Sequence, residues 1–169
     1  LLDAATAAKP DLCAFIVFGL YRGARRSEIV GLKWGDIDKD AEVIRIRRRL
    51  REERIRSRDG NYVVRLRTGE PKTPKSRRDL SLRGPVGVAV KEWRDDQNRR
   101  RLAAGWGWVD RGYLFKTDKG NPVYPSSLYR WYTQLLEHNG LPNISFHDLR
   151  RTWATLSLEA DIRIERVQE

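Results

Sequence analysis

The sequence predicts an α+β fold: a mainly helical domain with a small antiparallel three-stranded sheet on one side. Apolar residues recur at helical spacing towards both ends of the chain, whereas β-branched and basic residues are concentrated in the middle. The chain has 169 residues, the size of one ordinary domain with a single core. We therefore expect residues 1–169 to form one domain, with helices before and after the sheet.

The first predicted helix covers residues 11–20, and Pro10 suits its first turn. Its apolar face consists of Leu12, Phe15, Ile16, Gly19 and Leu20. Residues 21–24 interrupt the helical pattern, and Ser27 can open a second, short helix. Residues 34–38 have the composition of a loop.

Three strands are predicted in the middle of the chain. Residues 43–49 and 62–67 are rich in β-branched and basic side chains, and an Asp-Gly turn signal lies between them. This arrangement predicts that the two segments pair as antiparallel strands. A third strand, residues 79–82, follows the proline-containing turn at residues 71–76.

The remainder is predicted to be helical. Val86, Val90 and Trp93 share one helical face. A second helix, ended by Gly140 and Pro142, has an apolar face formed by Leu128, Trp131, Tyr132, Leu135 and Leu136. Ser145 is a plausible N-cap for a last helix, whose apolar stripe is Leu149, Trp153, Leu156 and Ala160.

The charge of the chain indicates a polyanionic partner. Lys and Arg number 34 against 23 Asp and Glu, a net charge of +11, and nucleic acid is the first candidate. No stretch is apolar enough to span a bilayer and residues 1–8 do not resemble a secretory leader, so we expect a cytoplasmic protein. Cys13 is the single cysteine, which excludes a disulfide within the chain.

Three motifs carry candidate chemistry. Residues 23–28 read Gly-Ala-Arg-Arg-Ser-Glu, residues 71–78 read Pro-Lys-Thr-Pro-Lys-Ser-Arg-Arg, and residues 147–150 read His-Asp-Leu-Arg. Each alone has a plain structural explanation: a basic surface corner, a solvated loop or a structural histidine. On a helix, however, His147 and Arg150 share a face and can reach the same small anion.

In this order, the three motifs resemble the tyrosine recombinases of the phage integrase family, and the resemblance extends from about Leu12 to Glu169. It implies a metal-independent, cofactor-free enzyme that breaks and rejoins DNA through a 3′-phosphotyrosyl intermediate. Arg25 and Arg150 would hold the non-bridging oxygens of the scissile phosphate, a task that suits a planar, permanently charged guanidinium.

The resemblance also implies roles for the other motif residues. Lys72 would be the general acid that protonates the leaving 5′ oxygen, with Lys75 as the alternative. His147 would hydrogen-bond the phosphate and assist proton transfer. Glu28 would orient the active-site cations, although an acidic residue facing a helix dipole explains it equally well.

Double-stranded DNA is the implied partner, and the full-length protein would form a tetramer on synapsed DNA. Beyond the catalytic residues, we expect five basic side chains to contact DNA. They are Arg45, Arg47, Lys75, Arg77 and Arg151.

The sequence departs from the family in what it lacks. The family's Leu-Gly-His type motif and nucleophilic tyrosine would follow Glu169, and the amino-terminal DNA-clamping domain would precede the chain. Tyr113, Tyr124, Tyr129 and Tyr132 all lie before His147 and do not match the nucleophile. We therefore expect a catalytic domain that is incomplete at its C-terminal end and inactive by itself.

Other functions remain open. A type IB topoisomerase uses a similar set of arginine, lysine, histidine and tyrosine. A non-catalytic DNA-binding remnant would also keep the basic sheet and helices. A structural RNA-binding protein would explain the charge, but it would not require His147 and Arg150 on one face.

Overall fold

The computed structural model describes residues 1–71 and 76–159. The helices are α1 (Leu2–Ala7), α2 (Pro10–Arg22), α3 (Arg26–Ile29), α4 (Pro85–Ala104), α5 (Pro125–His138) and α6 (Phe146–Glu159), with short 3-10 helices η1 (Trp34–Asp36) and η3 (Gly105–Gly107). The strands are β1 (Ile37–Asp38), β2 (Val43–Arg45), β3 (Arg49–Arg56), β4 (Tyr62–Gly69) and β5 (Asp79–Ser81). The predicted α+β fold is confirmed.

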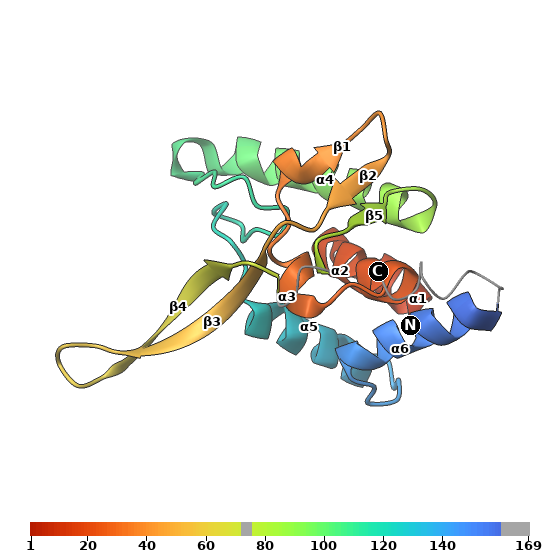
Figure 1. Cartoon of the computed structure of the whole chain (residues 1–169). Coiled ribbons are helices and arrows are strands. Elements are labelled where there is room, and N and C mark those ends of the chain that lie inside the picture. Colours follow the sequence, from red (N-terminus) through yellow and green to blue (C-terminus); the bar gives the residue numbers. More distant parts are fainter. Residues whose placement is uncertain (72–75, 160–169) are drawn as a thin grey trace.

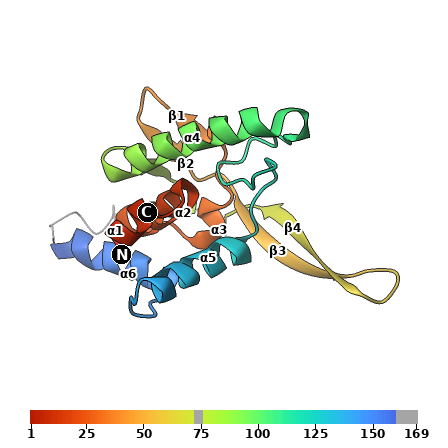
Figure 2. The ribbon, with the colours of Figure 1, turned by 180° about the vertical axis from the view of Figure 1, so that it is seen from behind.

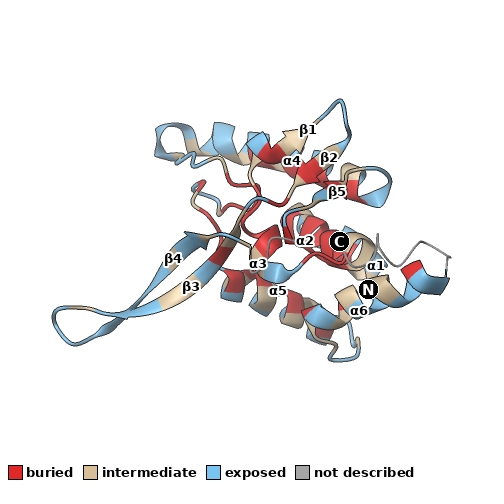
Figure 3. Cartoon of the chain, viewed as in Figure 1, coloured by how far each residue is buried: buried red, intermediate tan, exposed pale blue. Residues whose placement is uncertain are grey.

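Helix α2 is the centre of the molecule. It contacts α1, α4, α5 and α6, with α4 on one side and α5 and α6 on the other (Figures 1 and 2). Every residue from Asp11 to Gly19 is buried (Figure 3), because a helix that is apolar on most of its circumference must be covered on all sides. Pro10 occupies the first turn as predicted, and α2 ends at Gly23.

The predicted three-stranded antiparallel sheet is present, but its membership differs from the prediction. Its strand order is β1-β2-β5, whereas β3 and β4 form a separate two-stranded sheet. In the first sheet Ile44 lies opposite Leu80. The prediction that residues 43–49 pair with residues 62–67 is therefore wrong, as is the loop predicted at residues 34–38, which holds η1 and β1.

The predicted first strand is divided between residues 45 and 49. At this break Arg48 turns towards α3 and η1, where it donates hydrogen bonds to the buried carboxylate of Asp36 (3.0 Å) and to the carbonyl of Gly31 (3.3 Å). Alternation of side chains continues across the break, since Ile44, Ile46 and Leu50 are all buried. The period-two pattern therefore could not reveal that two strands are present.

The β3–β4 hairpin projects from the body of the domain (Figures 1 and 2). Eight residue pairs, from Arg49 opposite Gly69 to Arg56 opposite Tyr62, form its ladder. The predicted turn closes it, with Gly60 at a φ of 85°. Leu50, at the base, is its one fully buried residue, and most of the hairpin is exposed (Figure 3).

The three helices predicted after the sheet are present as α4, α5 and α6. They bury Trp93, Tyr132 and Leu149, respectively, in the core. The apolar stripe predicted on α6 is wrong at Leu156, which is 54% exposed. The residue that follows Trp153 on the inner face of the helix is Ser157, four positions later, and it is buried. Ala160 lies outside the described residues. Within the described part of the chain, no helix combines the length and apolarity that crossing a bilayer requires.

Candidate active site

The turn that carries Arg25 is fixed between α2 and α3. Gly23 ends α2 in the left-handed region with a φ of 55°, and its N–H donates to the carbonyl of Gly19. Arg25 then precedes the first residue of α3, and its backbone N–H donates to Glu28 Oε2 at 3.0 Å. The carboxylate thus caps the start of the helix and holds the backbone of Arg25 in place.

Helix α6 supplies the second half of the site. The predicted N-cap is confirmed, because Ser145 and Asp148 exchange hydrogen bonds between side chain and backbone in both directions. Phe146, in the first turn, stacks on Phe15 of α2 with ring centroids 4.1 Å apart. These contacts fix the helix start, from which His147 and Arg150 project on one side.

Glycine allows α6 to approach α2 closely at two points. A Cβ atom at Gly19 would lie 2.7 Å from the ring of Phe146, and one at Gly23 would lie 2.2 Å from the ring of Trp153. Arg150 also donates a hydrogen bond to the carbonyl of Gly23. The turn that carries Arg25 and the helix that carries Arg150 therefore form one rigid unit.

Arg25, His147 and Arg150 line one open cavity of about 400 Å³. The other lining residues are Ala24, Arg26, Ser27, Tyr129, Ser145 and Phe146. His147 is exposed, and the Arg25 side chain is 43% exposed, so both can meet a ligand from solvent. The structure thus brings together two segments that lie more than a hundred residues apart in the sequence.

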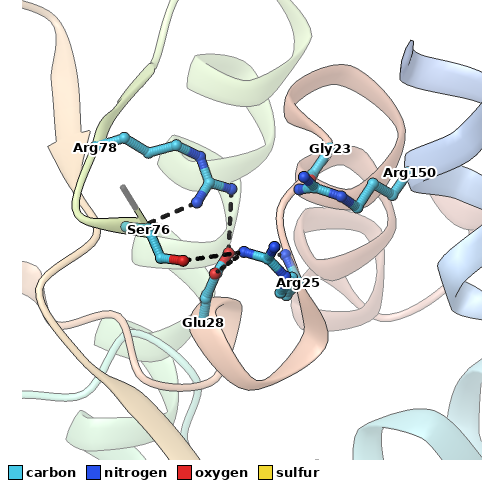
Figure 4. A network of polar contacts seen from close by, with 6 residues as sticks. All are labelled: Gly23, Arg25, Glu28, Ser76, Arg78 and Arg150. Carbon is cyan, nitrogen blue, oxygen red and sulfur yellow. Dashed lines mark hydrogen bonds and ion pairs between the residues drawn. The ribbon is translucent and has the colours of Figure 1, made fainter. Parts of the chain in front are cut away.

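Glu28 connects Arg25 to a further arginine (Figure 4). Its Oε1 accepts from Arg25 Nη1 at 2.8 Å, and its Oε2 accepts from Arg78 Nη2 at 3.1 Å. Arg25 Nη1 also lies 3.4 Å from Ser76 Oγ, and Arg78 donates to the Ser76 carbonyl at 3.4 Å. Glu28 therefore does more than cap a helix, since its carboxylate also accepts hydrogen bonds from two guanidiniums.

Burial and charge set the ionisation of this cluster. Burial raises the pKa of Glu28, but the charge of Arg78 and the hydrogen bonds from Arg25 and Arg78 outweigh burial and hold that pKa below its usual value. Burial, and then the positive charges of Arg25 and Arg78, lower the pKa of Arg150. Because the charges of Arg25, Arg78 and Arg150 repel one another, an anion bound beside them would relieve this repulsion and stabilise the cluster.

Three of the predicted DNA-binding residues lie together at a second place. Arg45, Arg47 and Arg77 line a cavity of about 450 Å³, along with Ile46, Arg78 and Asp79. Part of this charge is balanced, because Arg45 pairs with Asp38 at 2.7 Å and Arg77 pairs with Glu70 at 2.9 Å.

The remaining predicted residues are placed differently. Arg151 is exposed on α6, where it pairs with Asp148 at 3.0 Å, and it does not line either cavity. Lys72 and Lys75 lie outside the described residues, so their predicted roles stay predictions.

Two residues near the site were not predicted from the sequence: Arg78, which pairs with Glu28, and Tyr129, which lines the cavity. A signal for Arg78 existed: side chains two residues apart in a strand point to the same side, and Leu80 is apolar, so Arg78 should turn inward and Arg77 outward. The structure has that arrangement, with Arg77 exposed. Tyr129 lines the cavity from α5, and no motif marked it.

The sequence of this chain is similar to those of known proteins. The profile of the phage integrase family matches residues 1–169. A tyrosine recombinase XerC-like protein from Caldanaerobacter subterraneus is 32% identical over 161 residues, which cover 94% of this chain and 41% of that protein. An integrase from Streptomyces ambofaciens is 28% identical over 166 residues, covering 91% of this chain and 39% of that protein.

Solved structures share the fold. XerA recombinase superposes with a TM-score of 0.70 and 20% identity, over 99% of this chain and 49% of that chain. The Tn1549 transposon integrase, solved in complex with circular intermediate DNA, gives a TM-score of 0.69 and 22% identity, over 92% of this chain and 49% of that chain. The chain spans about two fifths of the length of the curated relatives that it matches.

Proposed function

The chain belongs to the phage integrase family of tyrosine recombinases, and on that basis we propose that it is the catalytic domain of an enzyme that cuts and rejoins DNA at specific sites. The single observation that carries the proposal is the convergence of Arg25, His147 and Arg150 on one cavity. Two guanidiniums and an imidazole are suited to a phosphodiester, whose non-bridging oxygens accept several hydrogen bonds at once.

In the proposed reaction a tyrosine oxygen attacks the scissile phosphorus, and the bond to the 5′ oxygen breaks. Arg25 and Arg150 bind the non-bridging oxygens and stabilise the charge that builds up on them in the transition state. His147, an exposed residue that lines the cavity, hydrogen-bonds the same phosphate and assists the transfer of the proton that the attacking tyrosine loses. Lys72, or Lys75 as the alternative, gives a proton to the leaving 5′ oxygen.

The nucleophile is proposed to be a tyrosine that follows residue 169 in the full-length protein. Two tyrosines of α5 can be compared with it. Tyr132 is fully buried, and burial raises its pKa to about 12, which makes it a poor nucleophile. Tyr129 lines the cavity, but Arg26 stacks on its ring at 5.0 Å, and it comes before His147 rather than after it.

DNA is the proposed partner, since relatives of this fold were solved with DNA. The cavity lined by Arg45, Arg47 and Arg77 would contact backbone phosphates outside the cleavage site, and Lys75 and Arg151 would add further contacts. In the full-length protein, four copies would assemble on two synapsed duplexes. Exchange of strands between two duplexes distinguishes this proposal from a type IB topoisomerase.

The proposal is tested by two single variants in a full-length protein that carries this chain. Arg25→Ala and Arg150→Ala should each slow single-turnover cleavage of a duplex with the protein's recombination site by about a hundredfold to a thousandfold. DNA affinity should change little, because many other phosphate contacts remain. If affinity falls in proportion to the rate, the two arginines are only DNA anchors, and the chain is a non-catalytic DNA-binding domain.

A further inference from the structure

Arg78 differs from the other arginines near the cavity in how little of it reaches solvent. Its side chain is 9% exposed, against 43% for Arg25 and 61% for the neighbouring Arg77. A cation this buried is costly unless it is paired. It donates hydrogen bonds to the Glu28 carboxylate and the Ser76 carbonyl, and both belong to the network around Arg25.

The two oxygens of Glu28 are divided between the two arginines. Oε1 accepts from the Arg25 side chain at 2.8 Å, while Oε2 accepts from Arg78 at 3.1 Å and from the Arg25 backbone N–H at 3.0 Å. Glu28 is 3% exposed, so water screens it little. Without Arg78, its negative charge would be opposed mainly by the Arg25 guanidinium.

The charge balance follows from these contacts. Among the described residues, the charged groups that face Glu28 are Arg25 just before α3, Arg78 just before β5 and Arg150 on α6. Three positive charges against one carboxylate leave an excess of two. Removal of Arg78 would halve that excess, although Arg78 does not line the cavity that Arg25 and Arg150 share.

We propose that Arg78 is a positioning residue of the cavity: it neutralises Glu28, so that this carboxylate can hold Arg25 without consuming the positive charge that Arg25 offers to a phosphate. The proposal rests on the proposed function of the cavity. Arg78 acts on this cavity through Glu28, since it does not line the cavity itself.

Sulfate is a suitable probe, because it is a tetrahedral anion that keeps its charge between pH 5 and 8. Binding to this chain is followed by NMR, using the Nε–H signals of the arginines. In the wild-type chain, sulfate should shift the Nε–H signals of Arg25 and Arg150. Arg78→Met should weaken binding by about threefold to tenfold, the loss expected for one nearby charge. Arg99→Gln on α4, which removes an exposed charge, should change the affinity for sulfate less than twofold.

The decisive variant combines Arg78→Met with Glu28→Gln. This pair of changes restores the excess of two positive charges and leaves an amide oxygen to cap the Arg25 N–H. Sulfate affinity should return to within about twofold of wild type. If Arg78 has only a structural role, the double variant should instead bind sulfate no better than Arg78→Met does. Should Arg78→Met fail to fold, the comparison is made between the double variant and Arg78→Lys, which keeps the charge and should bind within about threefold of wild type.

The outcomes separate the two proposals. If wild type shows no sulfate-dependent shift at Arg25 or Arg150, the anion cavity itself is wrong, and the role of Arg78 falls with it. If those shifts appear and are lost in Arg150→Met, but neither Arg78→Met nor the double variant differs from wild type, the cavity stands and the role of Arg78 is refuted. A double variant that folds, as judged by its thermal transition, and still binds more than threefold weaker than wild type also refutes it.

Discussion

Lys72 is the residue whose proposed role can be separated from that of the arginines by chemistry alone. A general acid matters when the leaving group is a poor one that must gain a proton as its bond breaks. An alkoxide needs this help, whereas a thiolate does not. In the full-length protein, Lys72→Ala should therefore cleave an ordinary phosphodiester slowly, but should recover most of its rate when the bridging 5′ oxygen is replaced by sulfur.

The matched control for this measurement is Arg150→Ala. Arg150 is proposed to bind non-bridging oxygens, which the sulfur substitution leaves unchanged, so its rate should not recover. If Lys75→Ala is rescued and Lys72→Ala is not, the acid is Lys75. If neither variant is rescued, the proton comes from another group and the lysine assignment fails.

The residues of the site differ in how far the sequence could predict them. His147 and Arg150 are three residues apart on one helix, so their common face follows from local geometry alone. The contact of Arg150 with the Gly23 carbonyl depends on how α6 packs on α2, which no local pattern contains. The Glu28–Arg78 pair spans fifty residues and depends on strand register, which is why the resemblance implied that Glu28 orients the active-site cations but did not identify Arg78.

At the level of elements, the turn between α2 and α3 must contain glycine at position 23 to bring the two halves of the cavity together. Gly23→Ala should lower the free energy of unfolding by about 2–4 kcal/mol, because a left-handed backbone is strained for alanine and the new methyl group overlaps the Trp153 ring. Gly140→Ala is the control, since its φ of 60° is similar and no atom lies near its Cβ. In a denaturant titration, Gly140→Ala should lower the free energy of unfolding by about 1 kcal/mol. Equal losses for the two variants would show that contact with Trp153 is unimportant.

The β3–β4 hairpin is the element that the sequence described least well. Its turn was predictable from the Asp-Gly signal. The sequence could not show that β2 and β3 belong to different sheets, because the buried contacts of Arg48 with Asp36 and Gly31 are tertiary. The basic character of residues 49–67 was visible in the sequence, but its presentation on a projecting arm was not.

The hairpin carries a face on which like charges meet. Arg51 lies directly opposite Arg67, and Arg65 lies opposite Glu53, the carboxylate that pairs with Arg67 at 2.9 Å. Like charges opposite each other destabilise a ribbon that has little core of its own, and a polyanion would relieve this repulsion. We therefore expect this face to contact DNA phosphates.

This expectation is tested through the salt dependence of DNA binding. Replacing Arg51 and Arg65 with glutamine should weaken binding of this chain to an arbitrary duplex and reduce the slope of log K against log salt by about 1 to 2. Arg99→Gln with Arg101→Gln, two exposed positions on α4, removes the same charge and should leave the slope nearly unchanged. A hairpin variant with the wild-type slope would mean that the arm does not contact DNA.

For the molecule as a whole, the distribution of charge and the cavity have different proposed roles. The net charge of +11 favours association with a polyanion such as DNA, whereas the cluster of Arg25, His147 and Arg150 is proposed to act on one phosphate. The composition predicted the first of these, and three short motifs predicted the second. Neither could reveal that α2, a buried helix with no direct role in chemistry, is what holds the two halves of the cavity together.

The proposed function requires this cavity to support strand cleavage through a covalent intermediate. The most direct measurement is to trap the protein–DNA adduct formed by a full-length protein that carries this chain, on a nicked duplex with its recombination site, and to map the modified residue by mass spectrometry. We expect a 3′-phosphotyrosine at a tyrosine that follows residue 169. Tyr129→Phe should form this adduct at the wild-type rate, and Arg150→Ala should form it at least a hundredfold more slowly. An adduct on Tyr129, or one that forms at the wild-type rate without Arg150, would contradict it.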